Sequence, residues 1–188
     1  MVTPYTVTYD GLPHSATVTS ITGVLGQTGG TVGTVNVSNT THTNAGTYAS
    51  DTWSFTGTAN YNNITATTIS DVINARSATV NYIGQQMWVT SGTSATTAQV
   101  TLTASMQDPT GTALVGATVD FIDVASNKVL AGGVPVSPVA GSPGTGTANK
   151  VVTLSTGQYG SQEYVILVKL TGNYDNSAQS GTDRKSVV

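Results

Sequence analysis

Apolar and polar residues alternate with a period of two through most of this 188-residue chain. Such alternation sends successive side chains to opposite faces of a strand. Glycine, asparagine, proline and serine separate the alternating stretches, as turn-forming residues do between strands. We therefore predict strands over residues 5–9, 15–21, 34–37, 48–55, 65–73, 78–82, 87–90, 98–106, 117–124, 128–131, 148–155, 163–171 and 185–188.

Short strands at this spacing, with no helical pattern between them, predict an all-β fold of sandwich modules rather than an α/β sheet. A strand ending DVINA runs into a strand beginning ATVNY, without a glycine- or proline-rich spacer between them. We place a domain boundary there and predict two tandem modules, residues 1–75 and residues 76–188. The second module ends in what reads as the start of a further strand.

One sequence unit occurs twice. Residues 46–63 read GTYASDTWSFTGTANYNN, and residues 157–176 read GQYGSQEYVILVKLTGNYDN. In a regular strand the odd step from Tyr48 to Trp53 would put these side chains on opposite faces, whereas a bulge at Ser50 would put both inward. The same two alternatives apply to the second copy.

Each copy closes on an Asn-Tyr pair that marks a corner, with Tyr61 in the first and Tyr174 in the second. A buried tyrosine there needs a partner for its hydroxyl group, and nearby backbone provides one in the tyrosine corner of immunoglobulin-type sandwiches. The run YVILVKL of the second copy, apolar on both faces until Lys169, predicts a central strand buried on both sides or a strand that faces a neighbouring module. Residues 134–147, VPVSPVAGSPGTGT, predict a long irregular surface loop, because proline cannot donate ladder hydrogen bonds.

Charged residues make up 8% of the chain, against about 25% in an average soluble protein. The hydrophobic share of 38% is enough for a core and argues against disorder. The basic residues are scattered and the net charge is −3, so we predict no nucleic-acid partner. Cysteine is absent, which excludes disulfides and thiolate metal sites.

No stretch approaches about 18 consecutive apolar residues, so we predict no membrane span in this segment. The first residues, MVTPYTVTYDG, lack the basic and apolar regions of a signal peptide. The last residues, GTDRKSVV, stop within a strand-like pattern. Both ends lead us to expect a piece of a longer polypeptide.

Two stretches of the chain resemble known bacterial families. YDGLPHSATVTSITGV (9–24), NTTHTNAGTYASDTWSFTGTANYNN (39–63) and ISDVINA (69–75) resemble the MBG-type, YDG-motif repeat of large bacterial surface proteins. DPTGTALVGATVDFID (108–123) and GTGTANKVVTLSTGQYG (144–160) are similar to bacterial Ig-like domains. The resemblance implies tandem extracellular modules of adhesive or cell-wall-associated proteins, and it brings no catalytic residues.

These observations predict a non-catalytic, extracellular spacer or structural module of a bacterial surface or adhesin-like protein, with neighbouring repeat modules in the same chain and no cofactor. One alternative is a module that binds a glycan or a cell-surface protein. Trp88, which follows the hydrophilic Gly-Gln-Gln of GQQMWVT, is the candidate ligand-binding residue, and edge-strand packing is its alternative role. Another alternative is a self-assembling unit that pairs exposed terminal strands.

Candidate metal sites are incomplete. His14 and His42 are the only histidines and lack an evident third ligand. Asp120 and Asp123 stand an odd step apart and should point to opposite faces of a strand. Asp108, in DPTG, should open a β-turn. We therefore predict no metal site, calcium included.

Catalytic patterns are also missing. The chain has no Gly-x-Ser-x-Gly elbow, and its nine acidic residues are scattered over turns and strand edges. We therefore predict that the protein is not an enzyme. An intramolecular Lys–Asn isopeptide bond would require a buried lysine beside a carboxylate. Lys169, on the same strand as Glu163, is the best candidate.

Overall fold

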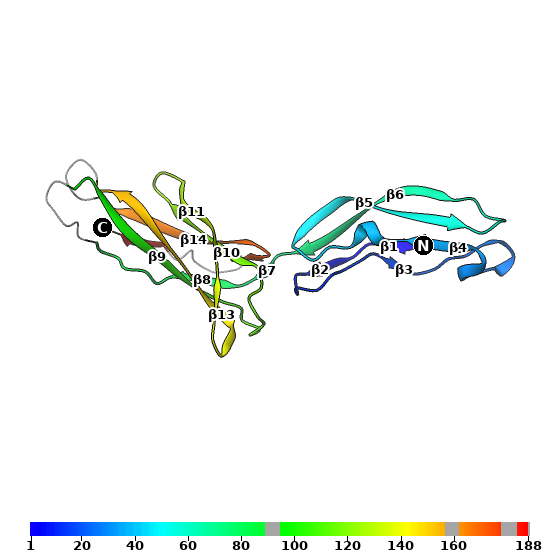
Figure 1. Cartoon of the computed structure of the whole chain (residues 1–188), viewed down its shortest axis with the longest axis horizontal. Helices are drawn as coiled ribbons and strands as arrows, with labels where there is room; N and C mark the ends of the chain where they lie inside the picture. Colours follow the sequence, from blue (N-terminus) through cyan, green and yellow to red (C-terminus); the bar gives the residue numbers. More distant parts are fainter. Residues whose placement is uncertain (89–94, 157–161, 178–183, 188) are drawn as a thin grey trace. The chain divides into compact units, whose positions relative to one another are not determined.

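The computed structural model describes residues 1–88, 95–156 and 162–177, together with the backbone of residues 184–187. The prediction of an all-β chain is confirmed. In the described part, the helical segments are three single-turn 3₁₀ helices, η1 (Val24–Gly26), η2 (Gly29–Thr31) and η3 (Ser38–Thr40). The chain divides into two compact units, Met1–Arg76 and Ser77–Val188 (Figure 1).

The first unit is built on a four-stranded sheet in the order β2-β6-β5-β4. Its long antiparallel pair is β5 (Gly46–Gly57) with β6 (Ile64–Asn74), as Figure 1 shows. β4 (Gly33–Asn36) pairs antiparallel with β5, and β2 (Thr6–Thr8) lies parallel to β6. A separate two-stranded sheet joins β1 (Val2–Thr3) to β3 (Thr17–Val18).

A bulge in β5 decides which of its side chains face inward. Tyr48 lies opposite Asp71 and Asp51 lies opposite Ile69, so three steps along β5 match two along β6. Asp51 is therefore on the same face as Tyr48, and Trp53, two residues further on, joins them. Of the two alternatives for this strand, the bulge is confirmed. Residues 157–161 of the second copy lie outside the described residues.

The second unit contains two four-stranded sheets, in the orders β11-β10-β14-β16 and β12-β13-β9-β8. The bounds are β8 (Thr79–Tyr82), β9 (Thr97–Gln107), β10 (Ala117–Asp123), β11 (Lys128–Pro135), β12 (Ser137–Val139), β13 (Ser142–Ser155), β14 (Tyr164–Gly172) and β16 (Arg184–Val187). Phe121 of β10 meets Tyr82 of β8 edge to face, with ring centroids 6.4 Å apart, so side chains of the two sheets share one core. A two-stranded sheet adds β7 (Arg76–Ser77) and β15 (Tyr174–Asp175).

The apolar cores of the two units differ. Among the buried hydrophobic residues described, Tyr9, Ala16, Val32 and Ile73 belong to the first unit, and all the others belong to the second. The second unit therefore has the conventional core of two packed sheets. The interior of the first unit consists largely of polar groups and half-buried aromatic rings.

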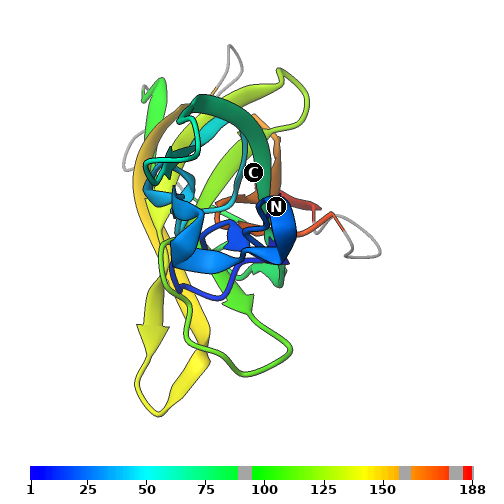
Figure 2. The ribbon, with the colours of Figure 1, turned by 90° about the vertical axis from the view of Figure 1, so that its right-hand side faces the viewer.

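The prediction of an irregular loop over residues 134–147 is wrong. The segment forms the end of β11, all of β12 and the start of β13, and the β12–β13 hairpin extends away from the rest of its unit (Figures 1 and 2). Pro138 is tolerated because β12 is an edge strand, where one side of the backbone needs no ladder partner. Gly141, with a φ of 77°, makes the tight turn.

Three strand predictions need correction. Residues 15–21 are mostly irregular, and only Thr17–Val18 pair, with β1. Met87 and Trp88 lie outside any strand, and the rest of the predicted strand 87–90 falls outside the described residues. The preceding strand, β8, ends before these residues, where the N–H groups of Ile83 and Gly84 both donate to the carbonyl of Thr103. The run YVILVKL is central in its sheet as β14, but only one of its faces is fully buried, because Val165 and Leu167 on the other face are half-buried.

Candidate functional site

The strongest gathering of ionisable side chains in the described part lies inside the first unit. Asp51 comes from β5, Asp71 comes from β6, and His42 precedes β5 in the chain. Asp71 is completely buried and Asp51 is 8% exposed. Burial of two carboxyl groups side by side is costly, so their partners decide what the cluster can do.

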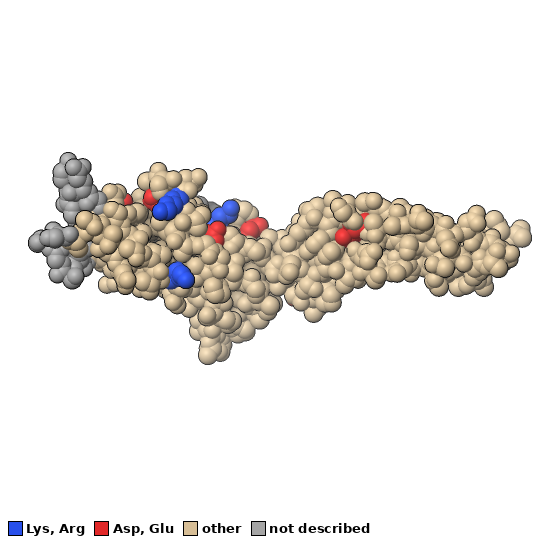
Figure 3. All heavy atoms as spheres, turned by 45° about the horizontal axis from the view of Figure 1, so that its top comes forward, with Lys and Arg blue, Asp and Glu red and all other residues tan. Residues whose placement is uncertain are grey.

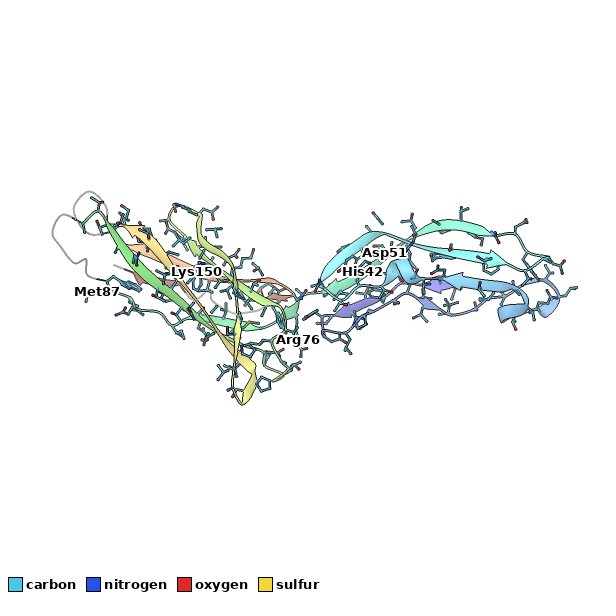
Figure 4. All side chains as sticks on the ribbon, in the orientation of Figure 1. His42, Asp51, Arg76, Met87 and Lys150 are labelled. Carbon is cyan, nitrogen blue, oxygen red and sulfur yellow. The ribbon has the colours of Figure 1, made fainter. Side chains whose placement is uncertain are left out.

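His42 is fixed from two sides. Its Nε2 atom lies 2.9 Å from both carboxylate oxygens of Asp51. Its ring stacks on Tyr48, with centroids 3.5 Å apart and ring planes 3° from parallel. The Tyr48 hydroxyl donates a 2.6 Å hydrogen bond to the backbone carbonyl of Asn44. Figure 4 shows His42 and Asp51 next to each other in the first unit.

Asp71 has one satisfied and one unsatisfied oxygen. Its Oδ1 atom accepts the backbone N–H of Tyr5 at 2.9 Å, while its buried Oδ2 atom has no hydrogen-bond partner. Burial raises the pKa of Asp71, and the neighbouring Asp51 raises it further; the Tyr5 N–H and His42 oppose this increase but do not cancel it. A proton on Oδ2 would satisfy this oxygen and turn it toward Asp51 as a donor.

Tyr5 and Thr40 connect the cluster to the rest of the unit. Burial, followed by the charges of Asp71 and Asp51, raises the pKa of Tyr5 to about 12, so its hydroxyl stays protonated. That hydroxyl donates to the carbonyl of Thr40 at 3.2 Å. The completely buried Thr40 hydroxyl accepts the N–H of Ala16 and donates to the carbonyl of Val37, at 2.9 and 2.7 Å.

The backbone brings the two histidines together, while their side chains bind separate carboxylates. His14 and His42 form an antiparallel bridge, with N–H to carbonyl distances of 2.8 and 3.0 Å. The Nε2 atom of His14 lies 3.0 Å from Asp10, whose pKa is lowered by the Leu12 N–H and then by His14. Among the described residues, no three His, Cys, Asp or Glu side chains are arranged to hold a metal ion.

The three aspartates singled out in the second unit serve turns and strand ends. Asp120 and Asp123 point to opposite faces of β10, as predicted: Asp120 accepts the N–H of Gly133 at 2.7 Å, and the buried Asp123 binds the Ser126 hydroxyl. Asp108 opens the predicted β-turn, in which the Gly111 N–H reaches the Asp108 carbonyl at 3.0 Å.

The remaining candidates stand apart from the cluster. Trp88 is half-buried beside the exposed Met87, and its role in ligand binding stays a prediction. Lys169 is exposed on β14 opposite Asp120, so it does not meet the requirement of a buried lysine for an isopeptide bond.

Both corner tyrosines bind loops that are distant in sequence. The Tyr61 hydroxyl accepts the N–H of Val24 at 3.1 Å and donates to the side-chain oxygen of Gln27 at 2.5 Å. The Tyr174 hydroxyl donates to the carbonyl of Ala113 at 3.2 Å. The prediction that each hydroxyl binds backbone is confirmed, but the partners are 37 and 61 residues away rather than nearby.

An asparagine two residues after each corner tyrosine repeats a second contact. Asn63 accepts the backbone N–H of Gly57 at 2.9 Å, and Asn176 accepts that of Leu170 at 3.2 Å. Each partner lies six residues upstream, so the two units share this local arrangement.

Asp51 and Asp71 were not predicted as site residues from the sequence. The signal was present for Asp71, which stands between Ile69 and Ile73 in the alternation and therefore shares their inward face. Asp51 had no such signal, because its direction depends on the bulge that precedes it. What this cluster can do chemically is hold and release a proton in a buried site.

No protein-family model matches the chain, and a comparison with curated proteins finds no match. In the described residues, no helix combines the length and the apolar character needed to cross a membrane.

Proposed function

We propose that this chain is a non-catalytic structural segment of a bacterial surface protein, in which an MBG-type module precedes an Ig-like module. The observation that carries the proposal is the repeated closure of the two units. In each, a tyrosine hydroxyl binds a distant loop, and an asparagine two residues later binds a backbone N–H six residues upstream. The same pair of tyrosine and asparagine contacts in both units supports the proposal that they are tandem modules.

These tyrosine and asparagine contacts suit a segment that transmits a pulling force along the chain. The contacts of Tyr61 and Tyr174 join the β5–β6 turn and β15, respectively, to a loop from an earlier part of the same unit. Pulling on the chain ends would have to break these bonds together with the antiparallel ladders of β5–β6 and β13–β9. Resistance to unfolding would therefore come from hydrogen bonds that are loaded together.

The surface chemistry is compatible with a spacer that attracts few charged partners. Residues 1–75 contain no lysine or arginine, and the basic residues of the visible face in Figure 3 all lie over the second unit. With 8% charged residues overall, long-range electrostatic attraction to other molecules is weak.

Single-molecule force spectroscopy of the whole chain tests the proposal. We expect two unfolding events, one per unit, and we expect Tyr61→Phe and Tyr174→Phe each to lower the force of one event only. Thr43→Ala, an exposed change in the first unit, is the matched control. If the unfolding force changes in neither tyrosine variant, the tyrosine contacts have no mechanical role. Labelling of intact producing cells with an antibody against the chain tests the location.

A further inference from the structure

The first unit contains a pocket that the proposed spacer role does not use. Its volume is about 290 Å³, and it lies between β1 with residues 20–22 on one side and strands β4, β5 and β6 on the other. Twelve residues line it: Met1, Val2, Ser20, Ile21, Thr22, Val32, Val35, Trp53, Phe55, Tyr61, Asn62 and Ile64.

Aromatic rings form one wall of the pocket. Trp53 and Phe55 are two residues apart on β5, so both point to the same face, yet neither is fully buried. Phe55 packs on Gly33 of β4, where an added Cβ atom would lie 2.4 Å from the ring. The ring is therefore seated against β4 and faces a hollow that the thin apolar core of this unit leaves open.

Tyr61 forms a third aromatic wall, and its position is fixed. Its hydroxyl is bound at Val24 and Gln27, and an added Cβ atom at Gly23 would lie 2.2 Å from the hydroxyl oxygen. Because the ring is held by both hydrogen bonds and close packing, the pocket is formed before any ligand arrives. Preformed walls reduce the ordering cost of binding.

The lining combines aromatic rings with uncharged polar side chains. Ser20, Thr22 and Asn62 supply hydroxyl and amide groups, and the lining also holds the Tyr61 phenol and Met1, whose N-terminal ammonium donates to the Ser20 carbonyl. An aliphatic chain would leave these polar groups facing apolar atoms. A pyranose ring fits both features, since its C–H face can stack on aromatic rings while its hydroxyl groups exchange hydrogen bonds.

We propose that this pocket binds one sugar ring, stacked on Trp53, Phe55 and Tyr61 and hydrogen-bonded through Asn62, Ser20 or Thr22. The volume of about 290 Å³ lies at the lower end of the range of roughly 300–1,000 Å³ for small-molecule pockets, which suits a single ring. Trp53, not Trp88, is then the sugar-stacking tryptophan. The inference is independent of the mechanical role.

Tryptophan fluorescence gives a direct test, because the chain has two tryptophans. The Trp88→Phe variant keeps Trp53 as its one tryptophan and is titrated with glucose, galactose, mannose and N-acetylglucosamine. We expect a saturable change in emission with at least one of them, with a dissociation constant on the order of 1 mM.

Two variants place the binding in the pocket. Trp53→Ala, followed by NMR because it removes the fluorophore, should weaken binding by at least about tenfold. The exposed Asn62→Ala change should weaken it about threefold to tenfold without loss of fold. Thr43→Ala is the matched control: Thr43 is exposed, lies outside the lining, and its substitution should leave the affinity unchanged.

The outcomes separate the possibilities. Absence of saturation by every neutral sugar overturns the proposal, and so does binding that survives both Asn62→Ala and Trp53→Ala. Tighter binding of 1-octanol than of any sugar would also overturn it and make the pocket an apolar site. Unfolding forces report on the mechanical role alone, so the two proposals can fail separately.

Discussion

The Nε2 atom of His42 lies 2.9 Å from both carboxylate oxygens of Asp51, inside a unit that has no lysine or arginine before residue 76. Here an imidazole stands beside the buried carboxylate, at the position where a lysine or arginine is usual. The second carboxylate, Asp71, accepts the Tyr5 N–H but leaves its buried Oδ2 atom without a partner, and burial raises its pKa.

We expect the stability of the first unit to fall as pH rises through the native pKa of Asp71. Because that pKa is raised above the ordinary 3.8, the native chain keeps a proton that the unfolded chain has lost. The stabilisation from Asp71 is complete at a pH below the ordinary pKa of aspartate. It is lost as the pH rises through the raised pKa of Asp71 in the native chain. Urea unfolding followed by Trp53 fluorescence in the Trp88→Phe background, from about pH 4 to pH 8, measures it.

The substitution Asp71→Asn should remove this loss of stability of the first unit at rising pH. The amide nitrogen can donate to Asp51, as a protonated Oδ2 atom of Asp71 would. The amide oxygen can still accept the Tyr5 N–H. We expect stability at pH 7 to rise by about 1–3 kcal/mol, the cost of a buried unsatisfied polar group. Asp10→Asn is the control with the opposite sign, because the pKa of Asp10 is lowered and its contribution disappears as pH falls. A parent chain and an Asp71→Asn chain with parallel pH profiles would refute this assignment.

Loss of the imidazole should leave Asp51 poorly compensated. Asp51 is 8% exposed, so we expect His42→Ala to destabilise the first unit by about 1–3 kcal/mol. A double-mutant cycle with Asp51→Asn separates the pair from the lost stacking on Tyr48. A coupling energy near zero would show that stacking alone explains the effect.

The repeated asparagine should matter more in the second unit. Asn176 is half-buried while Asn63 is exposed, so water can replace the lost acceptor for Gly57 more easily than for Leu170. We expect about 1 kcal/mol of destabilisation for Asn176→Ala and about half of that for Asn63→Ala. Trp53 reports on the first unit and Trp88 on the second, in separate single-tryptophan backgrounds. Equal losses would contradict this difference in exposure.

Leu25 and Asn127 have nearly the same left-handed backbone conformation, with φ values of 52° and 53°. Asparagine tolerates that region and leucine does not. Since Leu25 is 99% exposed, Leu25→Asn should stabilise the first unit by about 1 kcal/mol, whereas Asn127→Ala should destabilise the second by a similar amount. Thermal unfolding of both variants decides whether backbone strain is relieved.

The sequence by itself determined features that depend on neighbours along the chain. Strand phase placed Asp120 and Asp123 on opposite faces, and the turn chemistry of Asp-Pro-Thr-Gly placed Asp108 at the start of its turn. These predictions succeeded because alternation and turn preference are local properties.

Tertiary structure decided what depends on partners. Asp51 and Asp71 meet because a bulge in β5 sets the register with β6. The alternation of apolar and polar residues does not reveal the extra residue of a bulge, which is defined only by the pairing of the two strands. Pro138 belongs to a strand because β12 is at an edge, a fact of sheet order rather than of residue type. The aromatic pocket forms because β1 and residues 20–22 lie across Trp53 and Phe55 without filling the space between them.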